Sequence, residues 1–304
     1  MSGFKPEVAV LARSKRFKAC WSAFIVRQLN ARGIHAWRVT PGHNPKYRPE
    51  DFKLVINYGT SHTPIWWDRL SPDCVVLNTP EQVGVSANKV KMFRAISELV
   101  PENCLEYFFD KDEAEEAIRE GKTVIARTLL SSHSGRGIVM SPPDPLPDAN
   151  LYTVLKRGPR LREYRVFMAN GQFKDVVCKK RKGREKLLEM GVSPDEADTW
   201  WNNRMRQVVR CWDNGWAFCH NNLPMSDQRV FDEIALKTSR LLTWGCVDVL
   251  IDSSSKEWYM VEINSAPGLD AGNTQTSYLD SFEESALWLG VTKKEPVQLE
   301  RALV

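Results

Sequence analysis

The sequence has no long apolar run, no paired-cysteine motif and little net charge, and each absence narrows the range of functions. No stretch of ~18 consecutive apolar residues occurs, so we expect no membrane-spanning helix. The first residues, MSGFKPEVAVLARSKRF, lack the apolar core of a signal peptide, so we expect a cytosolic protein. The seven cysteines form no CxxC pair, which gives no support to a zinc ribbon or a redox motif. We interpret them as small buried hydrophobic residues in a reducing compartment.

The charge balance argues against a dedicated nucleic-acid binder. The 42 basic and 38 acidic residues leave a net charge of only +4, whereas nucleic-acid-binding proteins are usually more basic. The densest basic run, KKRKGREK at residues 179–186, is more commonly a solvated loop after a strand. A nucleic-acid role would instead show salt-dependent binding that arises mainly from these residues.

The first part of the chain alternates strand and helix signals. The apolar run VAVLA at residues 8–12 predicts a strand, and apolar residues at helical spacing over residues 17–31 predict a helix. Three further short apolar runs predict strands at residues 34–39, 53–59 and 74–78. This alternation is typical of an α/β layer with a parallel sheet.

The following segments predict mixed lobes of strands and helices. Ser86 is a candidate N-cap for a helix that ends near Leu99. The four prolines within residues 141–150 exclude a helix interior or a central strand and predict an exposed connection. The Asn170-Gly171 pair predicts a hairpin turn between two antiparallel strands. Later helices are expected over residues 227–242 and 277–289.

A hairpin with acidic side chains is the most specific feature of the sequence. Strands at residues 245–251 and 257–264 are joined by a short turn, which brings Asp248 beside Glu262 and Asn264. Glu262 and Asn264 are two residues apart and therefore share one face of their strand. Such a cluster of hard oxygen ligands suits Mg²⁺ or Mn²⁺. The alternative is a solvent-facing polar edge, but the residues on both sides of Glu262 are apolar.

The segment VDVLI…EWYMVEINSAPGL, residues 247–269, resembles the metal-binding end of ATP-grasp ligases. The resemblance is to the branch that includes the ribosomal-protein glutamate ligases. It implies an ATP-grasp fold with an N-terminal α/β domain, and it implies that Asp248, Glu262 and Asn264 hold the metal ions that bridge the ATP phosphates. The expected domains are an N-terminal α/β domain at 1–85, a central lobe with the glycine loop at 86–160 and a C-terminal lobe with the metal site at 161–304.

The segment VIARTLLSSHSGRGIVM, residues 124–140, matches the loop that covers the nucleotide phosphates in this family. Small residues there let backbone N–H groups approach phosphate oxygens, although a simple surface turn is the alternative reading. The family usually has lysine at the end of the preceding strand, where this chain has Arg127. A clade common in phages is similar in having arginine there. The phosphate-binding residues that the resemblance implies are Arg127, Ser134, Gly135 and Gly137, with Lys89 or Lys156 taking part of the role of the missing lysine.

Further matches lie in the strand pair EYRVFMANGQFKDVVCKKR. By resemblance, Glu163 contacts ribose or adenine and Arg165 faces the phosphates or the acceptor. Lys179 and Lys180 lie on the returning strand near the nucleotide, and LYTVLK at residues 151–156 is the hinge that reads adenine. Arg210 is expected to stabilise the transferring phosphoryl group, the alternative being a surface salt bridge.

The resemblance implies an ATP-dependent ligase that activates a carboxylate as an acyl phosphate and joins it to an amine. The expected cofactors are ATP and Mg²⁺ or Mn²⁺. The expected partners are a carboxylate substrate and an amine acceptor, which ranges from a small molecule to a peptide or protein. The alternatives are an ATP-grasp kinase without an amine step and a nucleotide-binding protein without turnover.

Overall fold

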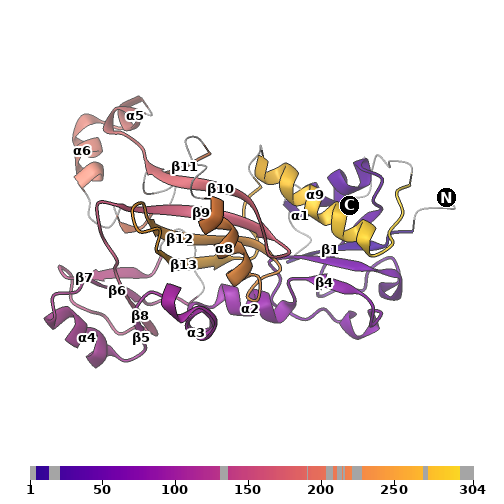
Figure 1. Cartoon of the computed structure of the whole chain (residues 1–304), viewed down its shortest axis with the longest axis horizontal. Coiled ribbons are helices and arrows are strands. Elements are labelled where there is room, and N and C mark those ends of the chain that lie inside the picture. Colours follow the sequence, from indigo (N-terminus) through magenta and orange to yellow (C-terminus); the bar gives the residue numbers. More distant parts are fainter. Residues whose placement is uncertain are drawn as a thin grey trace.

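The computed structural model has three β-sheets that follow one another along the longest axis of the molecule (Figure 1). It describes residues 5–13, 21–130, 136–189, 191–202, 208–210, 214, 216–220, 228–269 and 273–294. Within these residues no helix is both long and apolar enough to cross a membrane. Short 3₁₀ helices at Pro49–Asp51, Trp67–Arg69 and Pro101–Asn103 join longer elements.

The first sheet is parallel, as the alternation of strands and helices predicted. Its strands are β1 (Val8–Ala12), β2 (Ala36–Val39), β3 (Leu54–Tyr58) and β4 (Val75–Leu77), in the order β2-β1-β3-β4. All five residues of β1 are buried, which requires cover on both faces of the sheet. Helix α1 (Trp21–Ala31) supplies Ile25 and Leu29 on one side, and Phe52 and Trp66 pack on the other.

The predicted helix beginning at Ser86 is wrong at its N-terminus, because two helices occupy this region. Helix α2 (Pro80–Ala87) begins at a capping box. The hydroxyl of Thr79 accepts from the backbone N–H of Gln82, and the side-chain oxygen of Gln82 accepts from the backbone N–H of Thr79. Ser86 lies inside α2 and donates its hydroxyl proton to the carbonyl of Val83. Asn88 then caps helix α3 (Lys89–Leu99).

A second sheet is antiparallel, with the order β5-β8-β6-β7. Its strands are β5 (Tyr107–Phe108), β6 (Val124–Arg127), β7 (Ile138–Ser141) and β8 (Leu151–Val154), and helix α4 (Lys111–Arg119) packs on it. The proline-rich segment 142–150 is an irregular connection between β7 and β8, as predicted.

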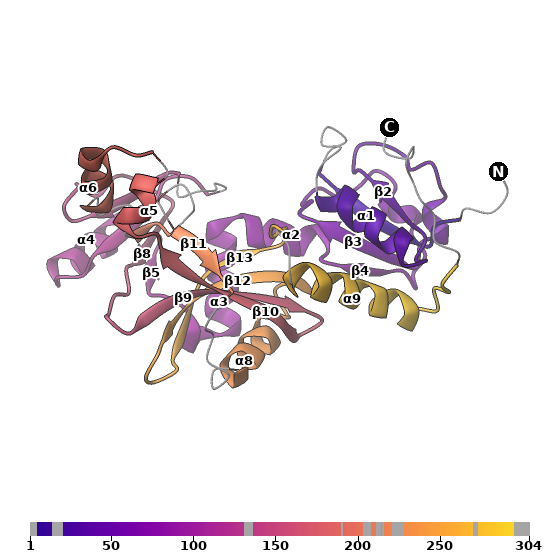
Figure 2. The same cartoon turned by 90° about the horizontal axis from the view of Figure 1, so that it is seen from above.

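The third sheet lies between the other two and is antiparallel throughout (Figure 2). The predicted hairpin turn is present, with φ of 52° at Asn170 and 73° at Gly171, the left-handed values that such a turn requires. Helices α5 (Arg184–Glu189) and α6 (Pro194–Asn202) extend from the sheet between β10 and β11. Its strands, in the order β11-β10-β9-β12-β13, are β9 (Leu161–Ala169), β10 (Gln172–Arg181), β11 (Trp216–Cys219), β12 (Trp244–Asp252) and β13 (Trp258–Asn264).

The two faces of this third sheet have different cover. Helices α3 and α8 (Gln228–Thr238) pack on one face, where they meet apolar residues such as Val166 and Val247. On the other face, helix α9 (Asn273–Trp288) packs on Phe167, Trp244 and Cys246 and joins them to the core of the first sheet. Neighbouring residues of a strand point to opposite faces of the sheet. The polar side chains of β9, β10, β12 and β13 therefore lie on the same face of the sheet as α9, in the part of that face that α9 does not cover.

Asn78 links the first sheet to the start of β12. It is fully buried and has a φ of 63°. Its side-chain amide donates to the carbonyl of Trp244 at 2.7 Å, and its oxygen accepts from the N–H groups of Thr243 at 2.8 Å and Trp244 at 3.2 Å. One side chain thus fixes the strand that carries Asp248 against the neighbouring sheet.

We expect Asn78→Ala to lower the free energy of unfolding by about 2–3 kcal/mol, because it removes three hydrogen bonds and leaves buried backbone groups unpaired. Guanidinium denaturation measures the change. Asn150→Ala, at an exposed position, is the matched control and should change stability by less than about 0.5 kcal/mol. Equal stability of the two variants would show that Asn78 is not a structural link.

Candidate functional site

Asp248 is the centre of a buried cluster of charged side chains. In the sheet it lies opposite Arg165 of β9 on one side and Glu262 of β13 on the other. Its Oδ1 accepts from Nε of Arg165 at 2.7 Å, and its Oδ2 accepts from Nη2 of Arg165 at 3.0 Å and from Nζ of Lys179 at 2.7 Å. The fork of Arg165 therefore holds the carboxylate in a fixed orientation.

The cluster continues through Lys179 to Glu163. Nζ of Lys179 lies 2.5 Å from Oε1 of Glu163, so one ammonium group bridges two carboxylates. Nε of Arg210 lies 3.5 Å from Oε2 of Glu163. Glu163, Lys179 and Asp248 are all less than 10% exposed, so these charges depend on one another rather than on water.

Burial and pairing act in opposite directions on these groups. Burial alone would raise the pKa of Asp248, but Arg165 and Lys179 hold that pKa well below its usual range. Burial raises the pKa of Glu163 despite the attraction of Lys179. Burial would lower the pKa of Lys179, but Asp248 and Glu163 raise it above its usual value. Asp248 and Lys179 are therefore both charged at neutral pH.

Glu262 and Asn264 lie beside Asp248 on β13, after a bulge opposite the bond between Asp248 and Val249. Nζ of Lys89, at the start of α3, lies 2.5 Å from Oε1 of Glu262. The Lys89 side chain is only 7% exposed, whereas Glu262 is 41% exposed and remains accessible to a ligand. The side-chain oxygen of Asn264 accepts from the N–H of Ala266 at 2.9 Å.

Arg127 approaches this region from the second sheet, at the end of β6. Its Nε is buried and has no hydrogen-bond partner among the described residues. Burial lowers the pKa of Arg127, and the charge of Glu262 partly offsets this effect. The backbone N–H of Lys89 donates to the carbonyl of Leu130 at 3.1 Å, which brings the loop after β6 against the start of α3.

Gly137 closes the described part of the loop between β6 and β7. Its φ is 70°, and its carbonyl accepts from the N–H of Thr128 at 2.9 Å. A Cβ at this position would lie 2.7 Å from Cγ of Leu129, so only glycine fits. Ser134 and Gly135 lie outside the described residues.

Two other predicted residues lie away from the cluster. Lys180 is exposed, because neighbouring residues of a strand point to opposite faces and Lys179 points inward. Nζ of Lys156 lies 3.3 Å from the ring centre of Tyr259. Lys156 and Tyr259 line a cavity of about 410 Å³ at the connection between β8 and β9, together with Arg157, Arg160, Asp252 and Glu257.

The sequence interpretation missed two aromatic residues of β11 that cover the cations. The ring centre of Trp216 lies 5.0 Å from the guanidinium of Arg210. The ring centre of Phe218 lies 4.7 Å from the guanidinium of Arg165 and 5.6 Å from Nζ of Lys179. The two rings share one face of the strand, within the alternating run WAFC. That alternation is the signal that could have indicated them.

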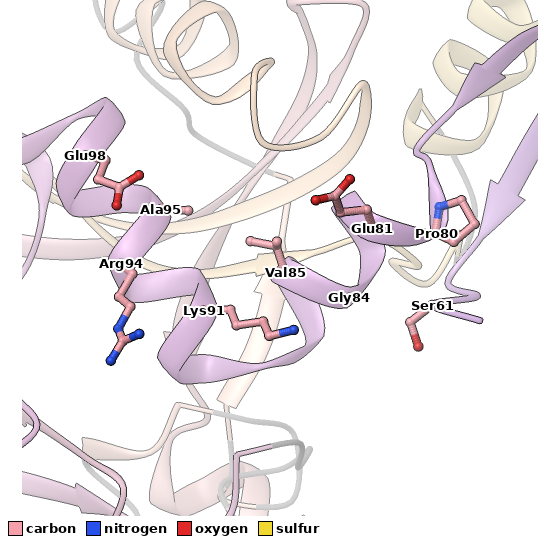
Figure 3. Close-up of a pocket in the computed structure, with 9 residues that line it drawn as sticks. All are labelled: Ser61, Pro80, Glu81, Gly84, Val85, Lys91, Arg94, Ala95 and Glu98. Atoms are coloured by element: carbon pink, nitrogen blue, oxygen red, sulfur yellow. The ribbon is translucent and has the colours of Figure 1, made fainter. Parts of the chain in front are cut away.

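A second cavity of about 420 Å³ lies between α2 and α3 (Figure 3). Its lining includes the uncharged residues Gly84, Val85 and Ala95 and charged side chains of both signs, including Glu81 and Lys91. Lys91 lies in the first turn of α3, as does Lys89, whose Nζ donates to Glu262. The first turn of α3 therefore contributes one lysine to this cavity and one to the charged cluster.

The donor set fits a divalent metal held jointly with phosphate. Among the described residues no group of three or more His, Cys, Asp or Glu side chains could enclose a metal by itself. Proteins usually contribute only a few ligands to Mg²⁺ when phosphates supply the other oxygens. The two carboxylates and one amide of Asp248, Glu262 and Asn264 match such a ligand set. The Nε of Arg127, which has no hydrogen-bond partner among the described residues, fits an anion.

The comparisons with known proteins identify the fold. No protein-family model and no curated protein matches the sequence. A D-alanine–D-alanine ligase from Bacillus anthracis is similar in structure, with a TM-score of 0.58 and 11% identity over 93% of this chain and 98% of that chain. An ATP-grasp RimK domain protein from Sphaerobacter thermophilus has a TM-score of 0.52 and 14% identity over 92% and 99% of the two chains. The ATP-grasp ligase PsnB, in complex with a minimal precursor, Mg and ADP, has a TM-score of 0.61 and 9% identity over 94% and 99%.

The chain therefore has the ATP-grasp fold, as the hairpin at residues 245–264 predicted. The similarity extends over nearly the whole of this chain and of each of the three proteins.

Proposed function

We propose that the protein is an ATP-dependent carboxylate–amine ligase that works through an acyl phosphate. Bound ATP supplies a phosphoryl group for the carboxylate oxygen, and an amine then displaces phosphate to form an amide. The neighbours in fold include a D-alanine–D-alanine ligase and a ligase in complex with a precursor, which supports this reaction class. The amine acceptor is a small molecule, a peptide or a protein.

One observation carries the proposal: the cluster holds more cations than carboxylates. Among the described residues, three carboxylates, Glu163, Asp248 and Glu262, face five cationic side chains, Lys89, Arg127, Arg165, Lys179 and Arg210. A buried excess of positive charge is costly without an anionic ligand. A nucleotide polyphosphate provides that anion.

The residues have separate roles in this proposal. Asp248, Glu262 and Asn264 hold Mg²⁺ or Mn²⁺, and Lys89 and Lys179 bind phosphate oxygens. Arg127, at the end of β6, and Gly137, Ser134 and Gly135, in the loop after it, enclose the phosphates. The arginine at position 127 supports membership of the arginine-bearing clade. Glu163 contacts the ribose or adenine, with Lys156 and Lys180 nearer the edge of the nucleotide site. Arg165 and Arg210 stabilise charge on the transferring phosphoryl group.

The three sheets support a proposed division into three domains. We assign residues 1–85 to an N-terminal α/β domain, 86–160 to the central lobe and 161–304 to the C-terminal lobe. Nucleotide then binds between the two lobes, where Arg127 of the second sheet approaches Glu262 of the third.

ADP release from MgATP tests the function. Purified protein is incubated with pools of amino acids, amines and peptides, and we expect pool-dependent release that Glu262→Ala abolishes. Glu116→Ala, on the exposed face of α4, is the matched control and should retain full release. A phosphorylated product without an amide would identify a kinase instead. ATP binding without release in any pool would favour a protein that binds nucleotide without turnover.

A further inference from the structure

The two carboxylates of the proposed metal site are already neutralised by cations of the protein. Nζ of Lys89 lies 2.5 Å from Glu262, and Nζ of Lys179 lies 2.7 Å from Asp248. Asp248 also accepts two hydrogen bonds from Arg165. A carboxylate has about four lone-pair positions, so three of those on Asp248 are taken. A metal ion that reaches Asp248 must therefore displace a hydrogen-bonded cation or take the one remaining position, whereas at Glu262 it competes with the charge of Lys89 on Oε1.

The lysines, rather than Arg165, are the partners able to move. Arg165 binds Asp248 through two parallel hydrogen bonds and is covered by the ring of Phe218. Lys89 and Lys179 are point charges on flexible four-carbon stems and can turn toward another anion. Their side chains are only 7% and 6% exposed, so water cannot replace the lost carboxylate. A displaced ammonium group therefore needs another anion close by.

The charge of the cluster determines which ligand supplies that anion. Five cations already face three carboxylates, so a divalent ion alone would increase the positive excess. It would also take Glu262 from Lys89, and it would leave Lys179 with Glu163 in place of two carboxylates. A nucleotide polyphosphate brings oxygens that accept from both lysines while the carboxylates turn to the metal.

We propose that Lys89 and Lys179 are shared counter-ions, which neutralise Glu262 and Asp248 in the nucleotide-free protein and pair with phosphate when nucleotide binds. Divalent metal then binds these carboxylates only together with nucleotide. The inference rests on the proposed function, because it takes a metal–ATP complex as the ligand. Coupling of this kind is reciprocal, so metal strengthens nucleotide binding by the same factor.

Manganese binding tests the inference without any measurement of turnover. Mn²⁺ is titrated into the wild-type protein with and without a non-hydrolysable ATP analogue. Electron paramagnetic resonance reports free Mn²⁺, and water-proton relaxation separates protein-bound Mn²⁺ from the complex with free nucleotide. We expect binding to the protein to be at least about a hundredfold tighter with the analogue.

Lys89→Met provides the second arm, because it frees Glu262 and keeps most of the apolar stem. Mn²⁺ binding without nucleotide should strengthen about tenfold or more, and metal-free binding of a fluorescent ATP analogue should weaken by a similar factor. Lys122→Met is the matched control, since Lys122 pairs with Glu106 and Glu120 on the surface of the second sheet. It should change neither affinity.

Each outcome decides a separate question. Equal Mn²⁺ affinity with and without the analogue would overturn the inference and leave the proposed function intact. If Lys89→Met weakens metal and nucleotide binding alike, Lys89 has a structural role only and the inference is again wrong. Failure of the wild-type protein to bind any ATP analogue contradicts the proposed function itself. The wild-type comparison needs no variant, so it holds even if Lys89→Met does not fold.

Discussion

Lys179→Met is expected to lower the free energy of unfolding by about 3–5 kcal/mol, the cost of removing one partner from a buried ion pair. Lys179 bridges Glu163 and Asp248 at 2.5 and 2.7 Å, and all three side chains are nearly inaccessible to solvent. Arg165 still pairs with Asp248 in the variant, but of the described cations only the more distant Arg210 still pairs with Glu163. Guanidinium denaturation at pH 7 measures the loss.

Lys180→Met is the control for this prediction because it is the adjacent residue on the same strand. Lys180 is exposed, so its replacement should change stability by less than about 0.5 kcal/mol. Adding Glu163→Gln to Lys179→Met should recover part of the lost stability, because the unpaired carboxylate is then neutral. Similar losses in Lys179→Met and Lys180→Met would contradict the assignment of Lys179 to the buried cluster.

Arg127→Met is expected to weaken ATP binding without lowering the free energy of unfolding. A charged hydrogen bond to phosphate contributes about 1.5–3 kcal/mol, so ATP affinity should fall about tenfold to a hundredfold. The free energy of unfolding should not fall, because Nε of Arg127 is buried without a partner among the described residues and its removal ends a desolvation cost. Fluorescence titration with an ATP analogue measures affinity, and guanidinium denaturation measures stability.

Two further variants sharpen the test of Arg127. Arg127→Lys restores the charge but not the planar fork, so its affinity should lie between those of wild type and Arg127→Met. Arg119→Met, on the exposed face of α4, should bind ATP as wild type does. Loss of stability in Arg127→Met with unchanged ATP affinity would show that Arg127 has a structural role and does not bind phosphate.

Local patterns in the sequence were sufficient to predict most of the helices and strands and the hairpin of β12 and β13. Alternation placed Glu262 and Asn264 on one face of β13, and the pairing of β12 with β13 sets Asp248 opposite Glu262. The Asn170-Gly171 turn places β9 beside β10, and a bulge between Phe173 and Asp175 then shifts the register. These features depend on residues close together in the chain, where side-chain period and turn chemistry decide the structure. The sequence interpretation placed a helix N-cap at Ser86 and missed the capping box at Thr79, where α2 begins.

The sequence by itself determined that Glu262 and Asn264 share one strand face, that a hairpin brings Asp248 beside them and that the fold is that of ATP-grasp ligases. Only the tertiary structure decided which cation meets which acid. Lys89 and Glu262 are separated by 173 positions, and Arg165 and Asp248 by 83. No local period specifies such pairs, because they form only when α3 and the three sheets pack together. Arg127 is a similar case, because only the packing of the fold leaves its Nε buried with no partner in the part of the chain that the structure describes.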